Sequence, residues 1–386
     1  MFKAATIASK EAYSYDMGIR LGEALIEKLG QLPGGCWLFC APGNGLKELI
    51  NGIGDAAATQ NLIGCTGAAE LSSAGFSTRS AVLGGIASDQ IEFEVVSVKN
   101  IGQDSEQAGK KLAGLFSSRV RNIQLFSDGI TGNGCALLRG INSIMEEQIP
   151  ITGGTAGDSG GFNKSWQFAG KKLLSDAAVA IGFKGEFRVG TGVQSGWSPV
   201  GLPKKVTRSS GNKLFELNNE PALNVFKRFL GKHAEKLPAV GVEYPLGFYS
   251  SCGSGDKDDH FLLRATMAVN HEEGSIIFAG DVPEGTMVHL TCGDKTSILE
   301  ATKKAIRLAV DELEGVKPAI AFFFSCMARK TVLGQRTKEE FGQVNMELGK
   351  NIPILGFYSF GEYCRVKSGG PCYFHNESAT ISVIGI

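Results

Sequence analysis

The chain has 386 residues, of which 43% are hydrophobic and 20% are charged, and it carries 39 basic and 39 acidic residues. This length exceeds what one hydrophobic core usually supports, and the composition is that of a globular protein, which excludes a mainly disordered chain. Because the charges balance, no net field attracts a polyanion, and nucleic acid is not an expected partner.

Membrane insertion and export are not expected either. The longest purely apolar run covers residues 319–324 and is too short to cross a bilayer, and residues 1–13 lack the apolar core of a signal peptide. The nine cysteines are odd in number and scattered, which favours reduced thiols over a disulfide framework. We therefore expect a cytoplasmic protein.

The first half of the chain alternates predicted helices and strands. Leucines at four-residue spacing predict an amphipathic helix over 12–29, and similar stripes predict helices over 105–116 and 134–145. Short apolar runs bounded by glycine or proline predict buried strands. These runs are 36–41, 62–65, 81–87, 93–98, 123–126, 177–183 and 187–193.

A polar stretch without periodicity, 207–212, predicts a junction between two domains, 1–212 and 213–386. The alternation of strands and helices predicts the α/β class, with a mixed sheet covered by helices in each domain and a cleft shared by both.

Beyond this junction, Asn219 before Pro221 predicts a helix start, and Leu237 would still lie on the buried side of that helix. Thr337 and Glu340 have the spacing of a capping box and predict another helix start. A long helix is indicated over 299–313. Further strands are predicted at 261–269, 275–279, 287–292, 320–324 and 354–358.

One pattern occurs three times: an apolar strand runs into a glycine-rich turn and is followed by an acidic residue. The three segments are 61–70, 149–158 and 352–362, and they end in Glu70, Asp158 and Glu362. One interpretation is that several strand ends converge on a cleft, where backbone N–H groups and carboxylates face a ligand. The other is that these are tight turns whose acidic residue caps a helix, and the residues alone favour that interpretation.

Two kinds of segment resemble known functional motifs, one of a protease and one of phosphate-binding loops, but the rest of the sequence does not support either function. Residues 157–161 reproduce the nucleophile segment of trypsin-like proteases, but the first histidine is His233, so the order of the triad is wrong. The loops 43–45 and 153–161 suit anion-binding nests, but neither has the ending of a P-loop or the full dinucleotide fingerprint.

Cys326, Cys364 and Cys372, with His375 close to the last of them, are side chains that suit zinc or an iron–sulfur cluster. Their spacing matches no standard finger, and the alternative is that Cys326 packs as a small buried hydrophobe. A cysteine enzyme that uses Cys326 or Cys252 is a further alternative, and it requires a histidine within hydrogen-bond reach of the thiol.

A haem ligand would be a neutral imidazole that faces an apolar slot. Among the five histidines we select His260, because it lies between the acidic stretch 256–259 and the apolar residues 261–263. For each histidine an ordinary surface or core role is the alternative, and Cys364 and Cys372 are alternative thiolate donors to a haem, although no Cys-Pro dipeptide supports that choice.

Several segments together resemble the FIST family, a sensory module that consists of FIST_N followed by FIST_C. They span most of the chain in the order of the family. The segments are 64–67 with Glu70, 153–158, 194–199 with 206–207, 281–285, 326–329, and 356–362 followed by His375 and Asn376.

The resemblance implies the sensing of a small, amino-acid-like ligand coupled to signal transduction, and no enzymatic activity. A chain with both domains and no fused output domain is similar to the NosP subgroup of nitric oxide sensing haem proteins. That similarity implies haem b, a metal site at the three C-terminal cysteines, and a histidine kinase or cyclic-di-GMP enzyme as partner in biofilm regulation. An amino-acid-like metabolite bound without haem is the alternative, and homo-oligomerisation is left open.

We therefore expect a ligand cleft between the two halves. Its expected residues are His260, Gly154, Asp158, Trp197, Glu362 and His375.

Overall fold

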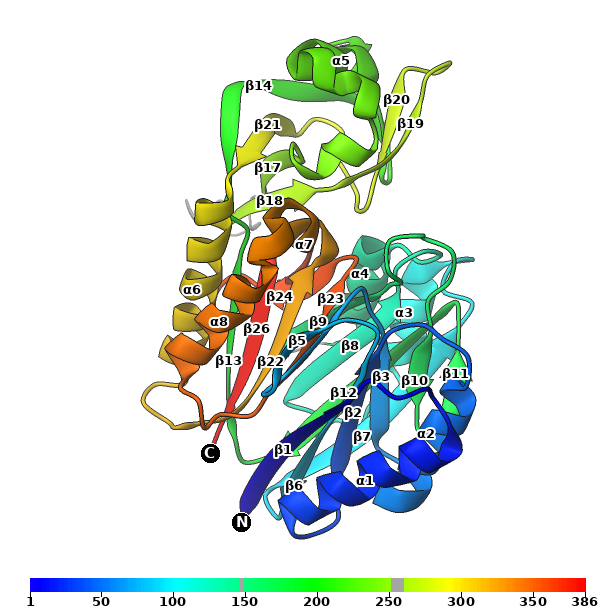
Figure 1. Ribbon diagram of the computed structural model, residues 1–386. Helices are drawn as coiled ribbons and strands as arrows, with labels where there is room; N and C mark the ends of the chain where they lie inside the picture. Colours follow the sequence, from blue (N-terminus) through cyan, green and yellow to red (C-terminus); the bar gives the residue numbers. More distant parts are fainter. Residues whose placement is uncertain (146–148, 251–259) are drawn as a thin grey trace.

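The computed structural model describes residues 1–145, 149–250 and 260–386, without the side chains of Ser250 and His260. Three six-stranded mixed sheets form a body, and a larger antiparallel sheet lies above it (Figure 1). The predicted α/β class, with mixed sheets covered by helices, is confirmed.

The three sheets of the body share one strand order and one pattern of directions, in which a parallel central pair is flanked by antiparallel strands. The first sheet has the order β1 (Phe2–Ser9), β6 (Ala81–Ser88), β2 (Gly35–Cys40), β3 (Leu62–Thr66), β10 (Gln167–Ala169) and β11 (Lys172–Leu174). The second has β7 (Ile91–Lys99), β12 (Ala177–Gly185), β8 (Asn122–Asp128), β9 (Ile151–Ala156), β24 (Glu362–Arg365) and β25 (Cys372–His375). The third has β13 (Arg188–Gln194), β26 (Ala379–Gly385), β22 (Pro318–Cys326), β23 (Ile354–Ser359), β4 (Glu70–Ser72) and β5 (Gly75–Ser77). The body therefore consists of three structural repeats, each containing one echo segment: residues 2–88, residues 91–185, and residues 188–194 together with 295–385.

Each repeat gives a short hairpin to a neighbouring sheet. The first repeat adds β4 and β5 to the third sheet, the second adds β10 and β11 to the first, and the third adds β24 and β25 to the second. The strands at the three predicted echo segments, β3, β9 and β23, occupy the same place in their sheets, and each receives one of these hairpins.

The exchange brings the strand ends together. The Gly157 N–H donates to the Thr66 carbonyl at 3.0 Å, the Ala68 N–H to the Tyr358 carbonyl at 2.9 Å, and the Thr155 N–H to the Gly361 carbonyl at 2.7 Å. The carboxyl ends of the three central pairs therefore converge.

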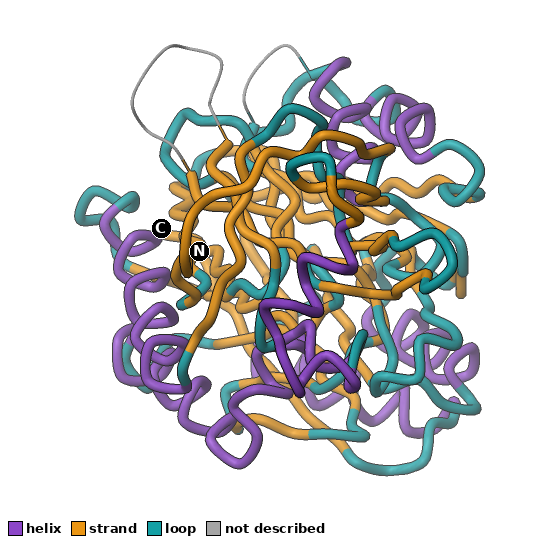
Figure 2. Tube along the Cα trace, turned by 90° about the horizontal axis from the view of Figure 1, so that it is seen from above, coloured by secondary structure: helices purple, strands orange, loops and turns teal. Residues whose placement is uncertain are grey.

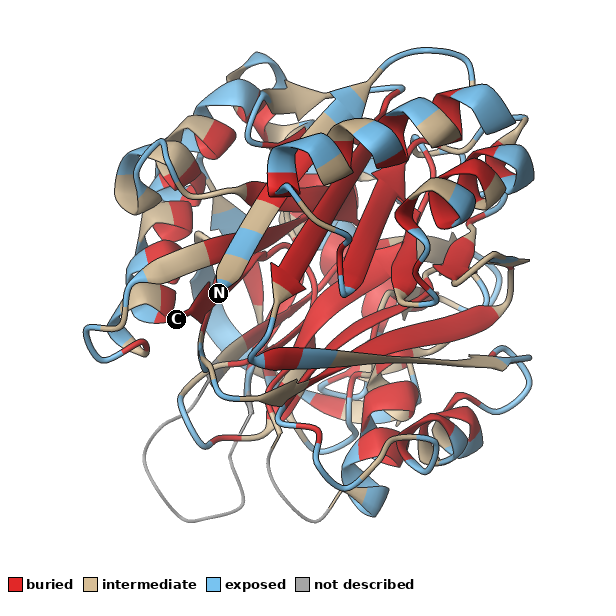
Figure 3. Ribbon diagram, turned by 90° about the horizontal axis from the view of Figure 1, so that it is seen from below, coloured by how far each residue is buried: buried red, intermediate tan, exposed pale blue. Residues whose placement is uncertain are grey.

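Pairs of helices cover the outer faces of the sheets, and the strands fill the centre (Figures 2 and 3). The pairs are α1 (Tyr15–Leu29) with α2 (Leu46–Ala57), α3 (Ser105–Ala113) with α4 (Gly134–Ile144), and α6 (Lys295–Asp311) with α8 (Thr337–Leu348). The stripe of α1 is buried as predicted, and the Ser14 side chain caps the helix by accepting from the Met17 N–H at 3.1 Å.

The inner faces of the three sheets pack on one another through aromatic rings. Phe39 comes from the first sheet, Phe126 from the second, and Phe324 and Phe357 from the third, and all four are fully buried. Neighbouring ring centroids lie 4.8 to 6.1 Å apart. Because each such pair contributes about 0.5–1.5 kcal/mol beyond its buried area, this cluster joins the three repeats into one core.

A glycine in the middle of β3, β9 and β23 permits the close pairing of the parallel strands. At Gly64 and Gly356 a Cβ atom would clash with the carbonyl oxygen of Leu38 or Phe323 on the adjacent strand, and Gly153 is equivalent. The glycine at the same position of each echo segment is thus a packing requirement.

The fourth sheet is inserted between β13 and α6, and we call it, with its helices, the cap. Its strands are β14 (Trp197–Ser210), β15 (Lys213–Leu217), β16 (Glu220–Pro221), β17 (Leu246–Ser250), β18 (His260–Arg264), β19 (Thr266–Asn270), β20 (Ser275–Phe278) and β21 (Met287–Gly293). Its helices are α5 (Ala222–Leu230), η1 (Gly231–Lys236) and η2 (Ala239–Val242). The boundary predicted at residue 212 falls in the turn between β14 and β15 and stays a prediction.

Two details of the second half differ from the sequence-based expectation. The helix that starts after Pro221 ends at Leu230, so Leu237 is not part of it. The predicted capping box is wrong: Arg336 is the N-cap of α8 and its side chain makes no capping bond. Glu340 is instead fully buried and forms an ion pair with Arg329 of α7 (Met327–Leu333).

Within the described residues, no helix combines the length and the apolar character that a membrane span requires.

Candidate functional site

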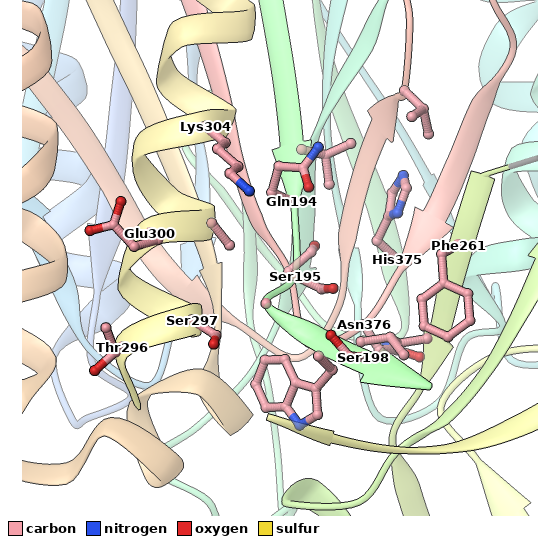
Figure 4. A pocket seen from close by; sticks show the side chains of 17 residues that line it. Gln194, Ser195, Ser198, Phe261, Thr296, Ser297, Glu300, Lys304, His375 and Asn376 are labelled. Carbon is pink, nitrogen blue, oxygen red and sulfur yellow. The ribbon is translucent and has the colours of Figure 1, made fainter. Parts of the chain in front are cut away.

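A cavity of about 590 Å³ lies where the cap joins the third repeat, and we call it the polar cavity (Figure 4). Three segments line it: 193–198, at the junction of β13 with β14; the first turns of α6; and the strand connection 375–378 before β26. Phe261 and Leu263 close it from the cap. A ligand here would touch the body and the cap together.

Two polar groups of this cavity lack partners within the described residues. Asn376 is 1% exposed, and neither its amide oxygen nor its amide nitrogen finds a hydrogen-bond partner there. Lys304 on α6 forms no ion pair in that part of the chain, and Figure 4 shows it extending toward Gln194. Buried polar groups are normally satisfied, so an unpaired amide at a cavity wall points to a ligand.

The aromatic and imidazole walls of the cavity are held in place by backbone carbonyls. The Trp197 indole N–H donates to the Glu243 carbonyl at 3.1 Å, and the His375 Nε2 lies 3.0 Å from the Cys364 carbonyl oxygen. Both residues are 5% exposed. The structure therefore places two of the predicted site residues, Trp197 and His375, in one cavity.

A fully buried arginine fixes the loop and the helix that form the cavity. Arg329 donates to the Ser195 carbonyl and, at 2.9 Å, to the Ile298 carbonyl of α6. Its charge is paired with Glu340, with an Nη2 to Oε1 distance of 2.6 Å. Because its hydrogen bonds reach three separate segments, we assign Arg329 to positioning and not to contact with a ligand.

Glu362 lies behind the wall of this cavity. It accepts hydrogen bonds from the Ser359 hydroxyl at 2.6 Å and the Ser378 hydroxyl at 2.7 Å, and Ser378 lines the cavity. Burial raises the pKa of Glu362 to about 8, although the two serine hydroxyls oppose the rise. Its cross-strand neighbour is Gly154, so this predicted pair is adjacent but outside the lining.

Family models match the chain over most of its length: the FIST N domain over residues 36–220 and the FIST C domain over residues 222–365. The chain belongs to the FIST family. It carries the FIST sensory domain pair, which is a signalling module.

The relatives of this FIST chain are themselves uncharacterized. A protein of Methanocaldococcus jannaschii is 26% identical over 348 residues, which are 82% of this chain and 63% of that protein. A protein of Mycobacterium tuberculosis is 26% identical over 215 residues, which are 54% of this chain and 53% of that protein. The FIST chain thus spans less than two thirds of the length of either relative.

Two solved structures align with the FIST chain at low similarity. Cyanuric acid hydrolase from A. caulinodans has a TM-score of 0.39 and 9% identity, and the alignment covers 100% of this chain and 99% of that one. A chorismatase has a TM-score of 0.35 and 6% identity, with coverages of 91% and 92%. These values are too low to support an inference about function.

Two of the segments on which the resemblance to FIST rests have structural tasks. Arg329 ends the segment 326–329 and positions the polar cavity. Asp281 begins the segment 281–285 and ties the cap to the body: its carboxylate accepts from the Asn133 amide at 2.7 Å and from the Arg139 guanidinium at 3.4 Å. The Arg264 guanidinium adds a bond to the Phe374 carbonyl at 3.1 Å.

Asp158 does not line the cavities described here. Its carboxylate accepts the backbone N–H groups of Gly160, Phe162 and Asn163 at 2.9 to 3.0 Å. Burial tends to raise the pKa of Asp158, but these hydrogen bonds prevail and the pKa is lowered. Asp158 therefore stabilises its own turn and caps no helix, and Glu70 and Glu362 begin the strands β4 and β24, so the interpretation of these acidic residues as helix caps is wrong.

The three cysteines predicted to bind metal have separate surroundings. The Cys364 thiol donates to the Arg365 carbonyl at 3.1 Å, and the Cys372 sulfur accepts from the Ile151 N–H at 3.2 Å. Cys326 lies at the end of β22, where burial, followed by the charge of Glu362, raises its pKa. Among the side chains that the structure describes, no group of three or more metal-ligating residues is arranged to hold an ion.

The predicted haem ligand is not placed. The backbone of His260 begins β18, but its side chain lies outside the described part, and so does Cys252. Lys304 of the polar cavity was missed, because a lysine on an exposed helix face carries no distinctive sequence signal. Gln194 begins the FIST-like segment 194–199, but it was not selected as a site residue.

Proposed function

We propose that this FIST pair is a sensor, not an enzyme, and that the polar cavity binds a small, amino-acid-like metabolite that carries a carboxylate. The observation that carries this proposal is the amide of Asn376, which has no hydrogen-bond partner among the described residues, in a cavity that is also lined by Lys304, whose ammonium has no ion-pair partner among them. The ammonium supplies the charge for a carboxylate, and the amide, Gln194 and Ser297 supply donors and acceptors for the remaining polar groups.

The signal would arise from the position of the cavity. Because its walls come from both the cap and the body, a bound ligand favours arrangements in which the two are held together, and it shifts the population toward them. A signalling protein that reads this arrangement, a histidine kinase or a cyclic-di-GMP enzyme, is the partner we propose.

The test is calorimetric titration of the full chain with a panel of amino acids and their carboxylate derivatives. We expect at least one to bind, and we expect Asn376→Leu and Lys304→Met each to weaken it by roughly tenfold or more, since hydrogen bonds to charged groups contribute about 1.5–3 kcal/mol. Lys338→Met is the matched control, because Lys338 is an exposed lysine of α8 that does not line the cavity. Absence of binding across the panel, or equal losses in the control, would contradict the proposal.

Haem b with nitric oxide as ligand is a second candidate, and one observation favours it. Ligating histidines usually give their other ring nitrogen to a carbonyl, and the Nε2 of His375 lies at such a distance from the Cys364 carbonyl oxygen. His375 would then be the residue that holds the iron, and the haem would supply the gas-binding centre. The many polar side chains of the lining favour the metabolite, because haem faces pack on apolar walls.

Purification from haem-replete cells separates the two candidates. A Soret band that shifts on addition of nitric oxide and is lost in His375→Ala supports haem. A colourless protein that binds a metabolite supports the first proposal.

A further inference from the structure

A second cavity, of about 480 Å³, lies between the cap and the carboxyl ends of β22 and β23, and we call it the apolar cavity. Leu237, Pro238 and Met267 line it from the cap, and Met327 and Phe360 from the body. Its size is within the range of small-molecule sites, and its walls are mainly apolar, which is also usual for such sites. It is therefore chemically unlike the polar cavity.

An exposed aromatic residue in a strained conformation borders this cavity. Phe162 is 43% exposed, has a φ of 51°, and packs against Phe360 with tilted rings whose centroids lie 4.5 Å apart. A bulky residue adopts positive φ only when its surroundings impose it. Here Asp158 imposes it, because its carboxylate accepts the Phe162 N–H at 3.0 Å. The chain holds this ring at the cavity and leaves it partly open to solvent.

Two polar groups line the apolar cavity below its rim. Thr266 is 4% exposed, and its hydroxyl has no hydrogen-bond partner among the described residues. The other group is Cys326, which is 3% exposed. A hydroxyl that is buried without a partner costs stability, so its presence at a cavity wall indicates a ligand that supplies the missing bond.

The surrounding charges determine which kind of ligand fits. The carboxyl groups of Glu362 and Glu377 act electrostatically on the Cys326 thiol, so they lie close behind this wall. At the rim, the exposed Glu235 and Lys236 have opposite charges. Burial raises the pKa of both glutamates and so favours their neutral forms, which leaves the inner wall without a charge that could attract a ligand. Neither an anion nor a cation would gain much at the rim, and either would have to leave water for an apolar lining.

We propose that the apolar cavity is a second ligand site, and that it takes a neutral, largely apolar molecule with a single hydrogen-bonding group, such as a medium-chain alcohol or a phenol. The apolar part of the ligand packs against Met267, Met327 and Phe360, and its polar group pairs with the Thr266 hydroxyl.

The two cavities share α7. Met327 and Ala328 of this helix line the apolar cavity, while Arg329 holds the Ser195 loop of the polar cavity. The second site is nevertheless independent of the proposed metabolite, since its own side chains define its chemistry.

The experiment is a fluorescence titration of the full chain with the neutral apolar probe N-phenyl-1-naphthylamine, followed by displacement with 1-octanol or octanoate. We expect saturable binding with one site per chain, and displacement by 1-octanol at concentrations at least about tenfold lower than by octanoate. Ala239→Trp fills the mouth from an exposed position of η2 and should weaken probe binding by about tenfold or more. Thr266→Val, which removes only the hydroxyl, should weaken 1-octanol about fivefold.

Ala234→Trp in η1 is the matched control, because Ala234 does not line the cavity. It should bind the probe like the unmodified chain. Non-saturable fluorescence, full binding by the Ala239→Trp variant, or octanoate as effective as 1-octanol would overturn the proposal.

Discussion

The first and third repeats of the body use the same strand plan, and both place a glutamate at the start of an exchanged hairpin. Glu70 accepts from the Ser80 hydroxyl at 2.7 Å, and Glu362 accepts from the equivalent Ser378 hydroxyl at 2.7 Å. In the first repeat the Tyr13 hydroxyl lies 3.0 Å from the carbonyl oxygens of Ala41 and Ser80 and closes the strand ends.

The third repeat differs in the connection that follows its first strand. Residues 10–14 link β1 to α1, whereas the whole cap is inserted between β13 and α6. Both of the large cavities described above lie where this insertion meets the third repeat. The repeated plan of strands therefore supplies a scaffold, and the enlarged connection supplies walls for both cavities.

The largest effect is expected from the ion pair that accompanies the third repeat. Arg329→Met leaves the buried carboxylate of Glu340 without its partner, so we expect the free energy of unfolding to fall by about 3–5 kcal/mol. Urea denaturation followed by circular dichroism measures it.

Arg336→Met is the control for this change, because Arg336 pairs with Glu339 on the protein surface and its loss should leave stability nearly unchanged. If the two variants had the same free energy of unfolding, the buried ion pair would contribute no more to the stability of the third repeat than the surface ion pair does.

The next largest effect is expected at the glycine that the repeats share in the middle of an equivalent strand. Gly356→Ala and Gly64→Ala each push a Cβ atom against a carbonyl of the adjacent strand, so each should lower the free energy of unfolding by about 1–3 kcal/mol or more. Gly342→Ala, on an open face of α8, should be neutral or stabilising. Tolerance of alanine at only one of the two strand positions would show that the repeats are packed differently.

The smallest expected effect is a difference between Glu70 and Glu362 in how each makes the free energy of unfolding depend on pH. Burial raises the pKa of Glu70 to about 7 and that of Glu362 to about 8, so the folded chain keeps protons that the unfolded chain releases near pH 4.5. The stabilising effect of each proton is therefore complete at low pH and is lost as pH rises through the folded-state pKa, by up to about 1.4 kcal/mol per pH unit.

Of these two glutamates, Glu362 is the one that still contributes appreciably to this decline between pH 7 and pH 8. We expect Glu362→Gln to flatten the dependence of stability on pH in that interval by about 1 kcal/mol, and Glu70→Gln to flatten it mainly below pH 7. Thermal unfolding scans at intervals of half a pH unit measure both, and identical profiles would contradict the difference in burial.

The sequence predicts those parts of the fold that rest on local periodicity. The stripe of α1 and the apolar runs of β2, β3 and β8 correspond to observed elements within a few residues, and the echo segments correspond to equivalent strands. Such patterns result from burial of one face, which a single chain displays directly.

Partnerships between distant segments could not be predicted in this way. Glu340 has the spacing of a helix cap, but it pairs with Arg329, and nothing local signals that choice. The hairpin β4 and β5 has only three residues in each strand and joins a sheet whose central strands lie more than 240 residues further along the chain. For the site, the sequence indicated Trp197 and His375 but not Lys304, whose role depends on what faces it across the cavity.

The exchange of hairpins has a consequence for synthesis and truncation. The first sheet is complete once residue 174 has left the ribosome, but the second needs β24 and β25, and the third unites β4 and β5 with the last strand of the chain. A fragment that ends at residue 212 would leave one edge of β9 unpaired and the hairpin β4 and β5 without its sheet, and such edges invite aggregation. During synthesis the N-terminal half therefore keeps open strand edges until the C-terminal strands have been made.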